Sequence, residues 1–290
     1  MRLPEAVIAA LAASSLAAGV LVALHYTPTW PLVMAAAGAG FGALSIILYS
    51  RRLMFIGAAS PHAGFLAAAA SIPLASTIGG PEWPWALLVG LLVVYIAGYM
   101  AYRGVDPDEA TSLMVSFSAS LGALAVYLVL SHYMVGGALA AIVVGDPLLA
   151  STGEALAAAT VAAGLATISL LIAREVYYAG IDYDDARLSG LRMWAYDLLL
   201  YTMIAVAAVA MVRIVGFVLE HALILLPGAV AYYASRGVYK SVVISTLAGL
   251  AAGLWGLVLG VAFNLAPSPL SGLILVALYL AARAWGGRSG

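Results

Sequence analysis

Glu220 and His221 are neighbours inside the apolar stretch VGFVLEHALILLP, residues 215–227. A carboxylate and an imidazole are ligands that zinc, manganese and iron(II) accept without any thiolate. His62, in the stretch AASPHAGF, is a second imidazole with apolar neighbours. An ionisable side chain in lipid costs a few kcal/mol unless it faces the interior of a helix bundle, so a functional role is the default interpretation. These three residues are the predicted metal-ligand candidates.

Three interpretations of the Glu220–His221 pair stay open. The pair could share a metal site with His62, form an outer gate of its own, or make a structural hydrogen bond between helices. Adjacent helical positions point about 100° apart, so at least one of the two side chains must face a cavity or a neighbouring helix. A rise of about 1.5 Å per residue places His62 and Glu220 about 10 Å apart in depth, which weighs against a shared site.

Three of the ionisable positions at membrane depth have simpler explanations. His62 follows Pro61 and could hydrogen-bond a carbonyl that the proline leaves free. Arg213 lies at the end of a predicted span, where its side chain can extend to the lipid headgroups. Glu154 follows Thr152 and is expected to cap the helix that starts there.

No catalytic motif accompanies these residues. The phosphate-binding pattern G-x-x-x-x-G-K-[ST] is absent, and the single lysine, Lys240, follows Tyr239 rather than a glycine. The HExxH pattern of zinc proteases is absent, and no carboxylate pair is typical of a glycosidase. We therefore expect no enzymatic activity and no cofactor bound by this chain itself.

The composition indicates which elements must position these residues. Of 290 residues, 65% are hydrophobic and 9% are charged, which is typical of a polytopic membrane protein. The net charge of −1 and the lack of a basic run indicate no nucleic-acid partner. The apolar runs are apolar on every face, which excludes a β-barrel and predicts a single all-α domain over residues 1–290.

A helical span needs about 20 apolar residues, and ten such spans are predicted. They are 5–25, 31–49, 54–78, 84–102, 111–132, 153–173, 194–212, 216–235, 241–263 and 268–285. A shorter apolar stretch, 136–150, is expected to re-enter the membrane or to lie in its interface. With a cytoplasmic N-terminus, every Lys and Arg except Arg213 falls on the cytoplasmic side. Both termini are therefore predicted to be cytoplasmic, in a multi-pass protein of the cell membrane.

The longest cytoplasmic segment contains REVYYAGIDYDDARLSGLR, residues 174–192. Asp182, Asp184 and Asp185 suit a helix N-terminus, where the helix dipole favours negative charge. Gly190 is expected to end that helix. The segment is either a solvated loop between two spans or a docking helix for a cytoplasmic partner.

Four stretches together resemble the membrane permeases of ABC importers for zinc, manganese and iron. They occur in the order of that family and cover about residues 40–285. They are RRLMFIGAASPHA at 51–63, GDPLLAS at 145–151, Asp182, Ala186 and Gly190 in the spacing D-x-x-x-A-x-x-x-G, and the run from Arg213 to Ala231 in the spacing R-x-V-G-x-x-L-x-x-A-L-x-x-x-P-x-A-x-A. Each stretch is weak alone, but the four in order are specific.

The resemblance implies the permease fold of type II ABC importers and a homodimer in the membrane. Each subunit would dock its 174–192 loop on a separate cytoplasmic ATP-binding subunit, and an external metal-binding protein would deliver the ion. The coupling helix would include Asp182, Asp185, Ala186 and Gly190. The expected function is translocation of a divalent metal ion, with ATP used by the partner.

Two positions depart from the pattern of that family. The family places an Asp four residues before the His, where the two side chains can share a divalent ion, but this chain has Ala58. An acidic residue is also usual after the position of Glu109, where this chain has Ala110. Conversely, the family has small or apolar residues at positions 220 and 221, so the pair there could replace the missing carboxylate.

Two other functions stay open. A permease for a metal chelate, such as cobalamin or a siderophore, has a similar number of spans and needs no ligand in its path. A stand-alone secondary transporter or channel would need ion-coupling carboxylates near the membrane midplane, and this chain has few.

Overall fold

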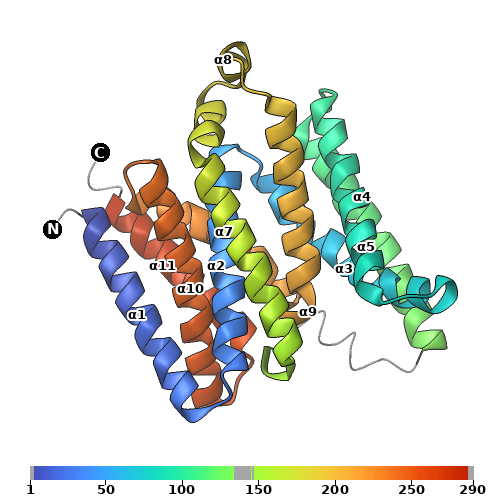
Figure 1. Cartoon of the computed structure of the whole chain (residues 1–290), viewed down its shortest axis with the longest axis horizontal. Helices are drawn as coiled ribbons and strands as arrows, with labels where there is room; N and C mark the ends of the chain where they lie inside the picture. Colours follow the sequence, from blue (N-terminus) through green and yellow to red (C-terminus); the bar gives the residue numbers. More distant parts are fainter. Residues whose placement is uncertain (1–2, 134–144, 146, 287–290) are drawn as a thin grey trace.

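The computed structural model describes residues 3–133, 145 and 147–286, and their regular structure is helical throughout. Figure 1 shows a bundle of long helices with a short one, α8, standing out at one end. The elements are α1 (Leu3–His25), α2 (Thr29–Ser50), α3 (Met54–Ile78), α4 (Glu82–Tyr102), α5 (Pro107–His132), η1 (Pro147–Leu149), α7 (Thr152–Ile181), α8 (Tyr183–Leu188), α9 (Met193–Ala234), α10 (Val238–Phe263) and α11 (Pro267–Gly286). Within the described residues, nine helices are long and apolar enough to cross a membrane.

The predicted spans correspond to these helices, except that 194–212 and 216–235 are the two halves of α9. The backbone of Gly216 (φ 79°, ψ 157°) interrupts the helix between them. In the first half Asp197 pairs with Arg51, and in the second half the ring of Tyr232 lies 5.0 Å from that of Tyr49. Because residues 49 and 51 are nearly adjacent, both ends of α9 lie at one end of the bundle. Thus α9 crosses the bundle twice, and the expectation of ten crossings is confirmed for the described chain.

The stretch 136–150 lies mostly outside the described residues, since 134–144 and 146 are not among them. Its described end is a single 3-10 turn, η1. The prediction that it re-enters the membrane therefore stays a prediction. The next helix, α7, begins with a capping box in which Ser151 and Glu154 satisfy each other's backbone, as expected for Glu154. It continues to Ile181, so the first part of the predicted 174–192 loop is helical.

Helix α2 is the centre of the bundle and packs against α7, α9 and α10. Close approach of two helices needs small residues at their contact, because transmembrane helices associate largely through van der Waals packing. A Cβ atom added to Gly38 would overlap the backbone of Gly249 in α10, and one added to Gly228 would overlap that of Ser45 in α2. The backbone NH of Gly228 also donates to Ser45 Oγ at 2.8 Å.

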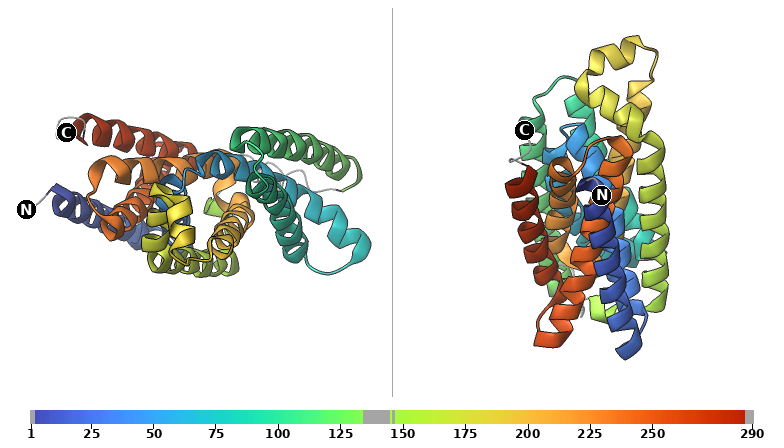
Figure 2. Two further views of the ribbon diagram at one scale, coloured as in Figure 1. Left: turned by 90° about the horizontal axis from the view of Figure 1, so that it is seen from above. Right: turned by 90° about the vertical axis from the view of Figure 1, so that its left-hand side faces the viewer.

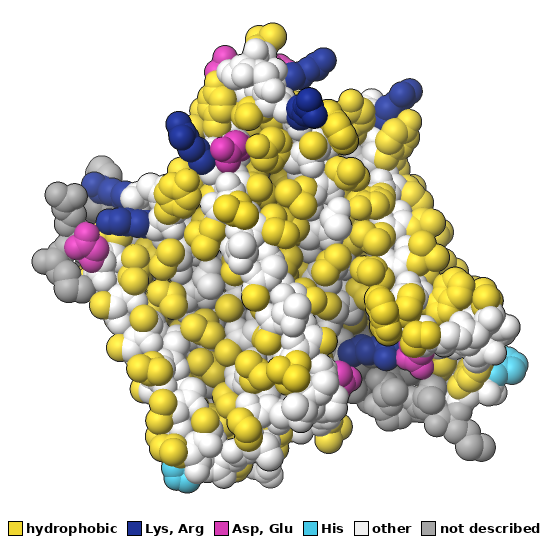
Figure 3. All heavy atoms as spheres, viewed as in Figure 1, with side chains coloured by type: hydrophobic (Ala, Val, Ile, Leu, Met, Phe, Trp, Pro, Cys, Tyr) yellow, Lys and Arg dark blue, Asp and Glu magenta, His cyan; other side chains and the backbone are white. Residues whose placement is uncertain are grey.

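Helices α3, α4 and α5 form a lobe on one side, and α1, α10 and α11 pack on the other side (Figure 2). The first half of α9 packs against α3 and α4, while its second half contacts α11 and also α2 and α3. Figure 3 shows a surface of mainly hydrophobic side chains, with basic side chains gathered toward the end that carries α8. This distribution is typical of a bundle surrounded by lipid, with α8 outside the apolar zone.

The Gly228–Ser45 contact gives a stability prediction. We expect Gly228→Ala to lower the thermal denaturation midpoint of the detergent-purified protein, because the added Cβ would overlap backbone that cannot move aside. Overpacking of this kind costs about 1–3 kcal/mol. The control is Gly164→Ala in α7, where a Cβ meets nothing within 4 Å. The control should melt at or above the wild-type temperature, because Ala is the better helix former. Equal melting of the two variants would contradict the prediction.

Candidate functional site

His62 of α3 and His221 of α9 lie in ring contact. Their ring centres are 5.5 Å apart, and Phe217 lies against both, at 4.8 Å from His62 and 4.6 Å from His221. Two imidazoles that bind one metal ion through nitrogen, at about 2.0–2.1 Å, have ring centres about 5 Å apart. The two rings are therefore close to the separation that a shared ion would need. We call His62 and His221 the imidazole pair.

The depth estimate from the sequence separated His62 from Glu220, but the next residue, His221, lies level with His62. Helix α3 and the second half of α9 run antiparallel, and their contacts define one register. A Cβ on Gly57 would lie 3.8 Å from Ile224, and the ring of Phe65 lies 5.9 Å from that of Phe217. His62 and His221 fall between these two contacts and are level with each other. The count from the ends of each predicted span could not see how the two helices are offset.

One hydrogen bond fixes the state of His221. Its Nδ1 lies 2.8 Å from the carbonyl oxygen of Phe217, one turn earlier in α9. A carbonyl can only accept, so Nδ1 donates and carries the proton. The lone pair of Nε2 is then available to a metal ion or a donor, which is the usual arrangement of a metal-binding histidine.

Glu220 occupies a different environment from the imidazole pair. Its side chain is fully buried, and neither carboxylate oxygen has a hydrogen-bond partner within the described structure. Across the described ranges, no three His, Cys, Asp or Glu residues are arranged to hold a metal ion. Of the three predicted ligands, the structure brings His62 and His221 into contact. Glu220 does not join them in a three-residue group that could hold a metal ion.

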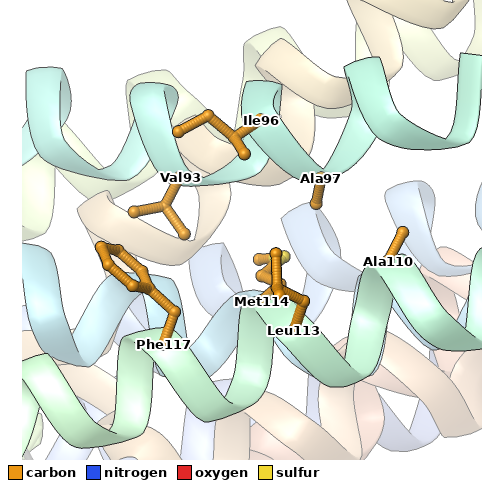
Figure 4. A pocket seen from close by; sticks show the side chains of 7 residues that line it. All are labelled: Val93, Ile96, Ala97, Ala110, Leu113, Met114 and Phe117. Carbon is orange, nitrogen blue, oxygen red and sulfur yellow. The ribbon is translucent and has the colours of Figure 1, made fainter. Parts of the chain in front are cut away.

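The two positions that depart from the importer pattern differ in their surroundings. Ala58 lies one turn before His62 in α3 and is half-buried, as His62 is. Ala110 is fully buried and lines an apolar pocket of about 240 Å³ between α4 and α5. Figure 4 shows only carbon and sulfur atoms in the side chains that line this pocket, among them Val93, Met114 and Phe117. Such a lining offers a cation a single thioether and no carboxylate, imidazole or hydroxyl group.

The predicted coupling helix forms a single turn and a half, α8, between α7 and α9. The Asp182 carboxylate accepts a hydrogen bond from the backbone NH of Asp185 at 2.9 Å and caps the helix. The Tyr178 hydroxyl of α7 donates to Asp185. Ala186 is fully buried between α7 and the start of α9, and Gly190 ends the turn with φ 89°. The acidic N-terminus and glycine stop predicted from sequence are therefore present.

Arg51 joins this region to the membrane helices. Its guanidinium pairs with Asp197 at 2.5 Å, with side chains that are only 9% and 12% exposed. It also donates to the carbonyl of Ala179 in α7 at 3.3 Å, and lies over the ring of Tyr183 in α8 at 4.9 Å. The Tyr183 hydroxyl donates to Asp197 at 2.8 Å. One cation thus links the ends of α2, α7, α8 and α9, beside a cavity of about 650 Å³.

The electrostatics of Tyr183 keep this link intact. The pKa of Tyr183 is raised to about 12, chiefly by burial and then by the hydrogen bond to the Asp197 carboxylate and the charge of that carboxylate, against a lowering by Arg51. A raised pKa means that the phenol keeps its proton and donates throughout the neutral range. The hydrogen bond that ties α8 to α9 therefore persists at any physiological pH.

Arg213 is also paired, at the opposite end of the bundle. It donates to Glu82 of α4 at 2.6 Å and to Ser71 of α3 at 3.2 Å. Its side chain is 39% exposed and forms an ion pair, while its extension to the lipid headgroups stays a prediction. This basic residue, the exception to the charge distribution, has a local partner.

Residues 29–286 match the sequence profile of the ABC 3 transport family. This match spans most of the chain.

The chain belongs to the ABC 3 transport family.

Similar proteins include named transport components. A "Probable metal transport system membrane protein" of Thermotoga maritima is 24% identical over 82% of this chain and 82% of its own length. The manganese import system permease protein ScaB of Streptococcus parasanguinis is 24% identical over 83% of this chain and 84% of its own length. Among solved structures, PsaBC from Streptococcus pneumoniae in complex with Fab has a TM-score of 0.77 at 21% identity, covering 89% of this chain and 91% of that one. A metal-chelate type ABC transporter in an inward-facing conformation has a TM-score of 0.72 at 12% identity, over 97% and 99%. The fold is that of ABC permeases.

Sequence reasoning missed two parts of the site in this ABC 3 family member. Phe217 packs against both imidazoles, and its spacing of one helical turn from His221 was the available signal. The Arg51–Asp197 pair was also missed. An acidic residue four positions into an apolar span was a signal that a basic partner lies nearby, but a sequence does not say which one.

The buried pair of this ABC 3 family member gives a second prediction. Asp197→Leu should lower the unfolding free energy by about 3–5 kcal/mol, because the buried Arg51 cation loses its partner. The combined Arg51→Met and Asp197→Leu variant should regain most of that loss, because neither charge is then buried. Thermal denaturation of the purified variants measures both effects.

A matched control is Lys240→Met, which breaks the exposed 3.4 Å pair with Glu5. It should change stability by less than about 1 kcal/mol, because surface pairs contribute little. A double variant as unstable as Asp197→Leu would show that the charge itself is not the cause.

Proposed function

We propose that this chain is the membrane permease subunit of an ATP-binding cassette importer for a divalent metal ion. The observation that carries the proposal is the imidazole pair, in which two histidines from separate transmembrane helices meet inside an ABC permease fold. The named relatives belong to metal and manganese transport systems, which supports the same class of cargo. Two protein ligands suit an ion that keeps part of its water shell and must leave again.

The chemistry of the pair favours zinc or iron(II) over manganese as the cargo. Imidazole is a preferred ligand of zinc and iron, whereas manganese favours carboxylate and water oxygens. Here Ala58 stands one turn before His62, where the importer pattern has an Asp, and the Glu220 carboxylate lies apart from the pair. The relatives named for manganese are similar in sequence to this chain. The paired candidate ligands of this chain, however, are imidazole nitrogens and not carboxylate oxygens.

The metal proposal predicts a specific loss in His221→Ala. In the reconstituted importer, the zinc concentration that half-maximally stimulates ATP hydrolysis should rise by about 10- to 100-fold, the range seen when a metal site loses a supporting group. The control is His25→Ala, because His25 makes the same Nδ1 bond to a carbonyl one turn earlier, at 2.9 Å, but is exposed in α1. Unchanged metal dependence in His221→Ala and in His62→Ala, with import of an intact chelate, would favour the chelate importer instead.

We further propose that α8 docks on a cytoplasmic ATP-binding subunit, and that two copies of this chain form the transmembrane unit. Two large apolar side chains, Leu188 at the end of α8 and Ile181 at the end of α7, are each 85% exposed. Helix α8 stands out at one end of the bundle (Figure 1). Exposed apolar residues around a short buried anchor, Ala186, are what a protein partner would cover. Both termini would then be cytoplasmic, and an external metal-binding protein would deliver the ion at the opposite end.

The docking proposal is tested by co-purification with the ATP-binding subunit. Leu188→Glu should abolish capture of that subunit, because it places a charge in the apolar contact. The control, Leu265→Glu, alters a leucine that is 56% exposed in the turn after α10 at the opposite end, and capture should be retained. Mass determination of the wild-type complex should find two copies of this chain. Metal transport by the purified chain without any ATP-binding subunit would instead establish a stand-alone transporter.

A further inference from the structure

The cavity of about 650 Å³ at the α8 end has a positively charged lining, and we call it the basic cavity. Three arginines line it, and Asp197 is the only acidic side chain among the described residues of its wall. Asp197 is already paired with Arg51. The other two arginines, Arg187 and Arg192, are exposed and have no ion pair or hydrogen bond with any described residue. Two positive charges in this wall are therefore without a partner.

Two different segments bring these arginines to the cavity. Arg187 follows Tyr183 by four residues in α8, so both side chains lie on one side of that short helix, and both line the cavity. Leu188, the proposed contact of the ATP-binding subunit, points about 100° away from Arg187. Arg192 is the residue before the start of α9. The side of α8 that faces the cavity is thus different from the side that carries Leu188.

Two rows of exposed side chains lead from the cavity along the membrane helices. On α4, Tyr102 lines the cavity, and both it and Tyr99, about one turn earlier, are exposed. On α9, Trp194 lines the cavity, and both it and Leu198, about one turn later, are exposed. Exposed Trp and Tyr side chains near helix ends are typical of the headgroup level of a membrane. The wall of the basic cavity is thus continuous with a surface suited to lipid.

Helices α4 and α9 are in direct contact on the membrane side of the cavity. Tyr201 lines the cavity, and a Cβ added to Gly98 of α4 would lie 2.6 Å from its ring. The hydroxyl groups of Tyr95 and Thr202 are hydrogen-bonded across the same two helices at 2.7 Å. The unpaired arginines would in addition repel a metal cation. These observations argue against a role of the basic cavity in the passage of the cargo.

The chemistry of the wall instead suits a phosphate group. The guanidinium of arginine matches phosphate oxygens through two parallel hydrogen bonds. Basic pockets between transmembrane helices are typical sites of anionic lipid headgroups. The volume lies in the range of small-molecule sites, about 300–1,000 Å³. A soluble anion would make no use of the two exposed rows, whereas the acyl chains of a phospholipid could lie along them.

We propose that the basic cavity binds the phosphate headgroup of an anionic phospholipid. Arg187 and Arg192 hold the phosphate, and Trp194 and Tyr102 lie where the acyl chains begin. This inference goes beyond the proposed metal import and does not depend on the identity of the cargo. The bound lipid joins α4, α8 and the start of α9, and so holds α8 in place relative to the membrane helices.

The test is binding of dioleoyl phosphatidylglycerol to the detergent-purified full chain, measured by native mass spectrometry over a lipid titration. The combined Arg187→Gln and Arg192→Gln variant should bind this lipid at least about tenfold more weakly, because two charges that attract the phosphate are removed. The variant should still fold, because neither side chain has a partner in the described structure. Dioleoyl phosphatidylcholine, whose headgroup has no net charge, should bind the wild type no better than phosphatidylglycerol binds the variant.

The matched control is the combined Arg236→Gln and Arg283→Gln variant. Both of these arginines are exposed near the same end of the bundle, after α9 and in the last turn of α11, and neither lines the basic cavity. The control should keep the wild-type affinity for phosphatidylglycerol. This lipid should also raise the thermal denaturation midpoint of the wild type and of the control more than that of the Arg187→Gln and Arg192→Gln variant.

Three outcomes would overturn the proposal. Equal weakening in the two double variants would show that general surface charge, and not the cavity, attracts the lipid. Binding of inorganic phosphate by the wild type, with no preference for phosphatidylglycerol over phosphatidylcholine, would assign the cavity to a soluble anion. Wild-type lipid binding by the Arg187→Gln and Arg192→Gln variant, together with loss of capture by the ATP-binding subunit, would assign both arginines to that partner.

Discussion

The positive φ of Gly216 is the constraint on which the arrangement of this protein depends. At 79° the backbone reverses a helix of 42 residues, a conformation that side chains with a Cβ rarely adopt. The reversal returns the second half of α9 to the α8 end and sets its register against α3. His221 thereby meets His62, and Tyr232 meets Tyr49. The space around the turn is equally restricted, because a Cβ on Gly145 would overlap the carbonyl of Val215.

The ionisable residues at membrane depth fall into two groups. Arg51 with Asp197, and Arg213 with Glu82, are paired across helices, and each pair ties together elements that are distant in sequence. Such pairs offset the cost of removing charge from water and break only at a large penalty. Glu220 is buried, and its carboxylate oxygens have no hydrogen-bond partner among the described residues. Burial of a charged carboxylate without a partner is costly. The paired residues join distant helices, whereas His62 and His221 contact each other and Glu220 has no hydrogen-bond partner among the described residues.

Most of the fold could be predicted from the sequence, but only part of the site. Apolar runs and basic residues define spans by local composition, so the ten crossings and the extents of helices such as α3 followed directly. The acidic cap at Asp182 and the stop at Gly190 were equally local. The contact between His62 and His221 was not, because it depends on the offset of two helices that are 159 positions apart in the chain. Arg51 and Asp197 are charged residues next to or within apolar stretches, which indicates that each has a partner of opposite charge. Nothing in either segment identifies the other as that partner.

Helix α9 connects the buried ion pair with the imidazole pair. The start of α9 carries Asp197, which is bound to Arg51 and through Tyr183 to α8. Its second half carries His221 and then Tyr232 on one face. Displacement of α8 would break the Tyr183–Asp197 hydrogen bond, whereas the Arg51–Asp197 ion pair itself joins α2 to α9. Gly216 joins the halves without regular helix geometry, and the second half is itself held in place, since Phe217 contacts His62 of α3 and Gly228 donates to Ser45 of α2. The position of His221 relative to His62 therefore depends both on the turn at Gly216 and on these packing contacts.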